Sequence, residues 1–143
     1  MGRHSEVGRI YHVRSATEGR QPLFRDLFAG RGVVQCMRFL HERGDVESLA
    51  FVVMPDHLHW LFQLGATGRL HEVMHSLKRQ SARGVNILLG RTGSPVWQSG
   101  FFDRALRKED DLKAIARYIV ANPIRAGLCR RVGDYPLWDA KWV

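Results

Sequence analysis

Hydrophobic and polar positions follow first a strand pattern, then a helix pattern, along the first half of the chain. Residues 8–15 (GRIYHVRS) form a short extended run with strand propensity. Apolar residues at helical spacing predict a helix over 27–41. Two apolar runs follow, at 47–55 and 57–64, and the Pro-Asp pair between them predicts a turn joining neighbouring strands.

The second half shows the same alternation of periods. The segment 68–90 carries one apolar stripe and predicts the clearest helix, the stripe being Leu70, Val73, Met74, Leu77, Ser81 and Val85. A Gly/Ser/Pro-rich loop at 91–100 precedes a predicted strand at 101–107. A last helix is predicted over 108–122, because acidic residues open it and Pro123 marks its stop or kink.

This order of elements, β-α-β-β-α-β-α, predicts the α+β class. It is the split βαβ arrangement of a ferredoxin-like antiparallel sheet, with one added C-terminal helix that contains Tyr118. The 143 residues are enough for one domain with a core, so a single domain is expected over 1–143. Beyond that helix, Trp138 and Trp142 are expected in a tail that folds back over the domain.

Composition narrows the class of protein. A hydrophobic content of 45% with 25% charged residues is typical of a folded chain. Cys36 and Cys129 lack the spacing of a disulfide framework or a zinc knuckle. There is no apolar run of about 18 residues and no apolar N-terminal stretch, so a cytoplasmic protein without a membrane partner is expected.

The net charge of +8, with a pI near 10.3, suits a polyanion, and nucleic acid is the commonest one. A merely basic surface gives the same charge. Charge alone leaves both interpretations open.

Two histidines stand out within the predicted strand 57–64. Residues two apart in a strand point the same way, so His57 and His59 share a face and could reach one metal ion. Leu58 and Trp60 then face the opposite side, where helices could cover them. The alternative is a pair of histidines whose hydrogen bonds are satisfied within a sheet.

The last predicted helix carries a second pair of polar residues. Its apolar stripe contains Leu112, Ile115 and Ile119, and Tyr118 lies on the flank of this stripe. Asn122 is four residues after Tyr118, so the two are neighbours on one side. Taken alone, Tyr118 is a boundary aromatic and Asn122 a turn residue.

Together these segments resemble a known family. The segment VVMPDHLHWLF (52–62) resembles the HUH motif of single-stranded DNA endonucleases, in which a hydrophobic residue separates two histidines. The segment 96–128 resembles the REP-associated tyrosine transposases, which have one catalytic tyrosine. The resemblance extends from Tyr11 to Leu128, and the two motifs occur in the family's order.

The resemblance implies a chemistry and a set of roles. His57, His59 and Asn122 would bind Mg²⁺ or Mn²⁺, which orients and polarises the scissile phosphate. Tyr118 would attack that phosphate, leaving a free 3′-OH and a 5′-phosphotyrosine linkage. The protein would then be a bacterial transposase that cleaves and rejoins single-stranded DNA beside a hairpin, associated with the nucleoid when bound to DNA.

Contacts to DNA are expected from basic and aromatic side chains. The arginines that could neutralise phosphates are Arg79, Arg83, Arg91, Arg104, Arg107 and Arg125. Trp97, in the loop 91–100, is either a platform on which an unpaired base stacks or a residue of the core.

Two other functions fit the same sequence. One is a hairpin-binding protein that does not cut, although the presence of both histidines, the tyrosine and the asparagine weighs against it. The other is a basic ferredoxin-like RNA-binding module. Such a module would have exposed aromatic residues on the sheet, where this sequence has histidines.

The resemblance also bears on assembly. In some relatives the tyrosine helix is donated to a partner subunit. Here the connection from Arg107 to Tyr118 is short, which favours a helix packed on its own sheet and a complete site within a monomer.

Overall fold

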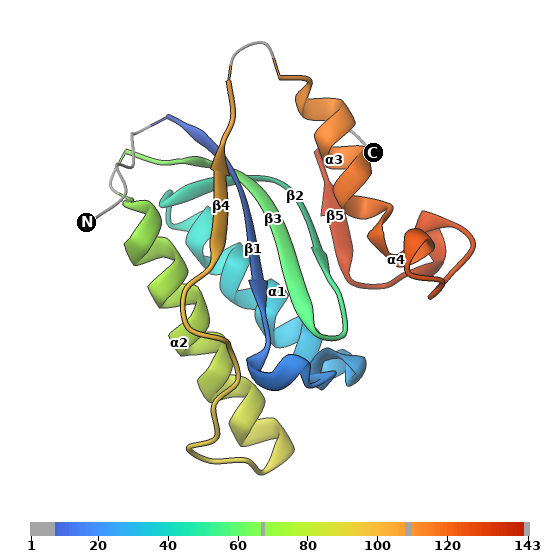
Figure 1. Ribbon diagram of the computed structural model, residues 1–143. Coiled ribbons are helices and arrows are strands. Elements are labelled where there is room, and N and C mark those ends of the chain that lie inside the picture. The colour runs from blue at the N-terminus through green and yellow to red at the C-terminus, as the bar shows by residue number, and fades with distance from the viewer. Residues whose placement is uncertain (1–7, 67, 108–109, 142–143) are drawn as a thin grey trace.

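A computed structural model describes residues 8–66, 68–107 and 110–141 (Figure 1). The strands are β1 (Ile10–Ala16), β2 (Val46–Val53), β3 (His57–Leu64), β4 (Phe102–Ala105) and β5 (Trp138–Ala140). The α-helices are α1 (Leu27–Glu42), α2 (Leu70–Leu89), α3 (Leu112–Val120) and α4 (Asn122–Arg125). Short 3₁₀ turns cover Glu18–Arg20, Leu23–Arg25 and Val132–Asp134.

The strands form one antiparallel sheet in the order β4-β1-β3-β2-β5. Its first four strands have the order of a ferredoxin-like sheet, so the predicted split βαβ arrangement is confirmed. The fifth strand was not predicted: Trp138 begins β5, which pairs with the free edge of β2. Trp142 lies outside the described residues.

Helices α1 and α2 cover one face of the sheet (Figure 1). Strand β3 contributes Leu58, Trp60 and Phe62 to the core on this face, and each is fully buried. The predicted stripe of α2, from Leu70 to Val85, packs against them, and every one of its residues is buried. Burial of this apolar surface is the main stabilising term of the fold.

Helix α3 lies on the other face, over β2 and β5, where it forms a second apolar cluster. Ile119 and Ala116 of α3 contact this cluster, which includes Leu61 of β3 and Val52 of β2. Within the described chain, no helix lies over β1 and β4 on this side of the sheet (Figure 1). We call this side of β1 and β4, together with the adjoining residues His57 and His59 of β3, the open face.

The bounds of α3 follow from local chemistry. The Asp111 side chain accepts a hydrogen bond of 3.1 Å from the amide of Ala114, which caps the helix one residue before it begins. The helix was predicted to reach Asn122, but it ends at Val120. Pro123 restricts the residue before it, and a separate turn, α4, begins at Asn122. Lys108 and Glu109 of the predicted helix lie outside the described residues.

Trp97 belongs to the core, so the interpretation as a base-stacking platform is wrong. Its side chain is 9% exposed and its Nε1 donates a hydrogen bond of 2.9 Å to Oγ of Ser81 on α2. Its ring lies 5.3 Å from that of Phe24. A nucleobase could reach this ring only if the core opened.

None of the helices in the described part of the chain is both long and apolar enough to span a membrane. The cytoplasmic location stays a prediction.

We predict that Trp97→Ala lowers the free energy of unfolding by about 3–5 kcal/mol, because it leaves a cavity in the core. Urea denaturation followed by circular dichroism measures the change. Phe28→Ala is the control, since Phe28 is 66% exposed and its loss should cost less than about 0.5 kcal/mol. A Trp97→Ala protein as stable as the unsubstituted one would contradict the core assignment.

Candidate active site

Strand β3 places His57 and His59 together on the open face. Leu58 lies between the two histidines and Trp60 follows them. Both are buried against the helices on the opposite face, as the alternation of side chains along a strand requires. The two imidazole rings lie 5.0 Å apart, centroid to centroid, with an interplanar angle of 77°. His59 is 8% exposed and His57 is half-buried. The predicted shared face of the two histidines is confirmed.

One ring nitrogen of each histidine is held by a neighbour. Nδ1 of His57 lies 2.8 Å from Oδ1 of Asp56, whose other oxygen accepts a hydrogen bond of 3.0 Å from Nε of Arg20. Nδ1 of His59 lies 3.0 Å from Nε2 of His12. Metal-binding histidines typically have such a partner on the ring nitrogen that does not bind the metal. The Nε2 atoms of both rings are therefore the ones that could bind an ion.

His12 was not among the predicted site residues. Its strand carries a signal, since His12 and Arg14 alternate with the buried residues Tyr11 and Val13. That alternation gives β1 one polar face. The position of His12 beside His59, however, depends on the register between β1 and β3, which a single sequence does not contain.

The neutral forms of His59 and His12 are favoured at this site. Burial lowers the pKa of His59 to about 3, assisted by the neighbouring histidines and by the charges of Arg14 and Arg125. Burial also lowers the pKa of His12, together with the charges of Arg104 and Arg14. A neutral imidazole has a free electron pair for a metal ion, whereas a protonated one does not.

Tyr118 is an exposed residue of α3, next to Arg125. Its side chain is 58% exposed on α3, and the Arg125 guanidinium carbon lies 3.8 Å from the ring centroid. Nη2 of Arg125 also donates a hydrogen bond of 2.6 Å to the Tyr118 carbonyl oxygen. Arg125 belongs to α4, the short turn that follows α3 directly. The charge of Arg125 also helps to lower the pKa of His59, so Arg125 is a common neighbour of Tyr118 and His59.

The other two tyrosines of the chain are unsuited to react with a large substrate. Tyr11 is 2% exposed and belongs to the core. The Tyr135 hydroxyl donates a hydrogen bond of 2.6 Å to the carbonyl oxygen of Val53. Burial, with a contribution from Cys129, raises the pKa of Tyr135 to about 12. Tyr118 is thus the one exposed tyrosine among the three, all of which the structure describes.

Asn122 has one amide atom engaged. Its Nδ2 donates a hydrogen bond of 3.0 Å to the carbonyl oxygen of Ile119 at the end of α3. This bond does not use the Asn122 amide oxygen, which keeps its electron pairs for another partner. Across residues 8–66, 68–107 and 110–141, no three His, Cys, Asp or Glu side chains are placed to hold a metal ion. A six-coordinate ion would need oxygens from water or phosphate in addition, which suits Mg²⁺ or Mn²⁺.

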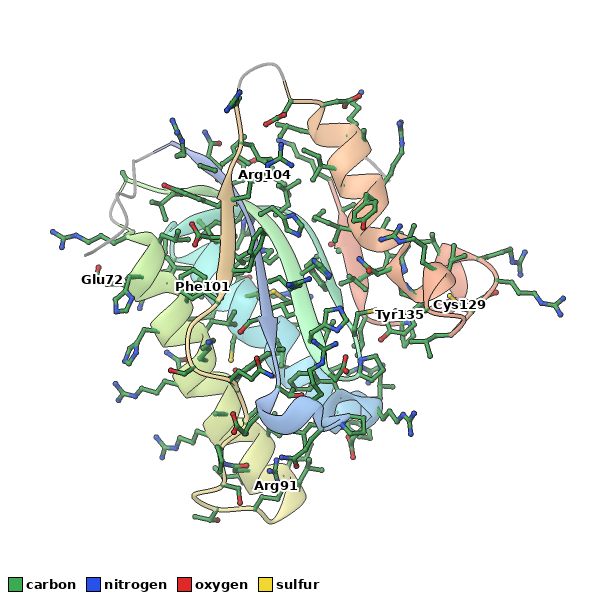
Figure 2. All side chains as sticks on the ribbon, in the orientation of Figure 1. Glu72, Arg91, Phe101, Arg104, Cys129 and Tyr135 are labelled. Carbon is green, nitrogen blue, oxygen red and sulfur yellow. The ribbon has the colours of Figure 1, made fainter. Side chains whose placement is uncertain are left out.

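Of the arginines predicted to contact DNA, Arg104 and Arg125 lie closest to this site. Both carry charges that act on the site histidines. Figure 2 shows Arg104 on β4, and its guanidinium lies 3.5 Å from the Asp110 carboxylate. Arg107 follows β4 with an exposed side chain.

The remaining arginines lie elsewhere. Arg79 and Arg83 are on the exposed side of α2, which covers the opposite face of the sheet from His57 and His59. Arg91 lies at the far end of α2 (Figure 2). Nη2 of Arg91 donates hydrogen bonds to the Gln21 side chain and the Pro95 carbonyl oxygen. The structure does not bring these three arginines together with the open face.

Comparison with known proteins identifies relatives of most of this chain. The family model described as "Transposase IS200 like" matches residues 7–122. A REP-associated tyrosine transposase of Escherichia coli is 26% identical over 88 residues, covering 61% of this chain and 50% of that protein. A relative from Haemophilus influenzae is 28% identical over 99 residues, covering 63% of this chain and 56% of that protein. The chain thus matches about half the length of these curated relatives.

A solved structure has the same fold. It is a REP-associated tyrosine transposase bound to a REP hairpin, with a TM-score of 0.76 and 21% identity. The match covers 96% of this chain and 80% of that chain.

We predict that His59 stays neutral in the folded, metal-free protein until the pH falls to about 3. The unfolded chain takes up this proton near pH 6.5. Between pH 6.5 and 3 the unfolded chain binds a proton at His59 that the folded protein does not bind. The free energy of unfolding is therefore not reduced by His59 above pH 6.5, and it decreases as the pH falls from 6.5 toward 3. Ring chemical shifts of His59, followed by NMR against pH, measure the effect. A titration midpoint of His59 near 6.5 would contradict the described burial.

Proposed function

The chain belongs to the IS200-like transposase family, and we propose that it is a metal-dependent endonuclease and strand transferase for single-stranded DNA beside a hairpin. One observation carries the proposal. The single exposed tyrosine among the chain's three stands beside Arg125, whose charge also reaches His59. A candidate nucleophile therefore shares a neighbour, Arg125, with the neutral imidazole of His59.

Tyr118 is the nucleophile in this proposal. Its phenolic oxygen loses its proton and forms a bond to the scissile phosphorus, while the bond to the 3′ oxygen breaks and that oxygen gains a proton. The products are a free 3′-OH and a 5′-phosphotyrosine. Attack of a 3′-OH on the phosphotyrosine reverses the step and joins strands without another energy source. The Arg125 guanidinium, 3.8 Å from the ring centroid, is placed to attract the phosphate.

The residues present fit a divalent ion. Nε2 of His57, Nε2 of His59 and the amide oxygen of Asn122 would hold it. Asp56 and His12 fix the orientation of the two imidazoles through their Nδ1 atoms. When bound, Mg²⁺ or Mn²⁺ would polarise the scissile phosphate. The low pKa of His59 keeps its electron pair available over the physiological pH range.

Single-stranded or hairpin DNA is the proposed partner. A relative with the same fold is bound to a REP hairpin, and the net charge of +8 favours a polyanion. Arg104 and Arg125 supply positive charge at the site itself. A protein that binds a hairpin without cutting it would share these features. Only the formation of a covalent protein–DNA adduct distinguishes the proposed enzyme from such a protein.

We also propose that the active site is complete within one chain. Helix α3 packs on β2 and β5 of its own sheet through Ala116 and Ile119. In this proposal Tyr118 therefore acts with the histidines of its own chain, and no partner subunit is needed.

Tyr118→Phe should abolish the protein–DNA adduct and leave affinity for DNA nearly unchanged, because only the hydroxyl is lost. The assay mixes protein with labelled single-stranded hairpin DNA and Mn²⁺, and a denaturing gel detects the adduct. Tyr135→Phe is the control and should keep adduct formation, since its hydroxyl bonds to the backbone. An adduct that persists in Tyr118→Phe would identify another nucleophile.

His57→Ala and His59→Ala should each weaken Mn²⁺ binding at least tenfold by calorimetry, because a direct ligand is lost. Asn122→Ala should weaken it less, since water can replace an amide oxygen. His75→Ala is the matched control, because His75 is exposed on α2 on the far side of the sheet. Unchanged Mn²⁺ affinity in both site variants would refute the metal site.

A mixture of Tyr118→Phe and His57→Ala proteins should remain inactive if each site is built within one chain. Each variant alone lacks an essential group. If subunits shared their sites, a mixed dimer would contain one site with both Tyr118 and His57 intact. The readout is cleavage of the labelled hairpin. Recovered cleavage in the mixture would show that subunits exchange α3.

A further inference from the structure

Three side chains form a row across the open face, beginning at the candidate active site. The strand register places His59 of β3 opposite Arg14 of β1, and Arg14 opposite Phe102 of β4. Neighbouring strands lie about 4.8 Å apart, so Phe102 lies roughly 10 Å from His59 along this row. That span corresponds to a few nucleotides of an unpaired strand.

Phe102 is unusual for a strand residue because its ring is largely exposed. It is 54% exposed, whereas its neighbour Phe101 packs against the core. The Arg14 guanidinium carbon lies 5.5 Å from the Phe102 ring centroid. An exposed ring with an arginine beside it offers a surface for stacking and a charge for a phosphate, which are the two groups that recognise single-stranded nucleic acid.

Phe102 and Arg14 border a hollow in the surface beside β1. Its volume is about 750 Å³, and Arg20 lies on its lining. Arg20 is bound to Asp56, the partner of His57, so the hollow and the active site share a wall. Asp103 also borders the hollow, which leaves it with two arginines and one carboxylate.

The loop that closes the hollow is held in place. Nζ of Lys78 donates hydrogen bonds to the carbonyl oxygens of Gln98, at 2.9 Å, and Gly100. The amide of Gln98 donates a hydrogen bond of 2.9 Å to the Ala16 carbonyl oxygen of β1. Trp97, just before this loop, is anchored in the core. A fixed loop needs little ordering when a ligand binds, which favours affinity.

We propose that Phe102 and Arg14 form a subsite that stacks one unpaired nucleobase of the DNA strand, a few nucleotides from the scissile phosphate. The Phe102 ring contacts the base, and Arg14 contacts the adjoining phosphate. This subsite rests on the proposed function for its ligand, single-stranded DNA. It positions the strand so that the phosphate reaches Tyr118, and it selects for a nucleotide that is not paired.

The test measures binding without cleavage, in Tyr118→Phe protein. The probes are fluorescein-labelled hairpins with short unpaired arms, copied from the palindromic DNA beside the gene. In each probe one nucleotide of an arm is replaced by an abasic residue. Affinity is measured by fluorescence anisotropy at constant salt.

Phe102→Ala should weaken binding of the intact probe about tenfold, the size of one base–aromatic contact. One abasic position should weaken binding to a similar degree, and should have no further effect once Phe102 is alanine. Phe102→Trp should restore both affinity and the effect of the abasic position. Phe28→Ala is the matched control: Phe28 is also exposed, has Arg31 beside its ring at 5.8 Å, and lies on α1.

An unchanged affinity in Phe102→Ala would overturn the subsite, as would abasic effects that are the same with and without the ring. These outcomes are independent of catalysis. The adduct assay on protein with Phe102 and Tyr118 intact tests the proposed function separately.

Discussion

The alternation of side chains along β3 is the constraint on which the rest of the structure depends. Leu58, Trp60 and Phe62 must be buried under α1 and α2, because leaving three large apolar side chains in water would cost several kcal/mol. That burial fixes the orientation of the strand. His57 and His59 must therefore lie on the opposite face of the strand. The core thereby holds the two imidazoles beside each other, and a shift of the register by one residue would exchange histidines for core residues.

The open face is built around these two histidines by elements distant in sequence. β1 supplies His12 to His59, and the turn before β3 supplies Asp56 to His57. The turn α4, which follows α3, supplies Arg125 to Tyr118. Each contact orients a functional side chain through a neighbour, so the site is organised before any substrate binds. Such preorganisation is what a site needs in order to act on a phosphate whose charge must be stabilised during reaction.

The sequence was sufficient for the order of the elements and for the shared face of His57 and His59, because both follow from local periodicity. It could not supply β5, whose three residues form a strand only by pairing with β2. Nor could it supply His12, since its position depends on strand register. Trp97 stayed undecided because its burial depends on Ser81, far away in sequence. The arginines predicted to contact DNA lie on two faces of the sheet. Which of them lie together depends on how the helices pack on the sheet, and this cannot be read from residue type alone.

The central claim is that Tyr118 forms a covalent bond to DNA within this site. The most direct measurement is mass spectrometry of the adduct made with hairpin DNA and Mn²⁺, after digestion by nuclease and protease. The account predicts a nucleotide joined to the peptide that contains Tyr118, through its phenolic oxygen. A nucleotide on the Tyr11 or Tyr135 peptide, or cleaved DNA with a free 5′-phosphate and no modified peptide, would contradict it.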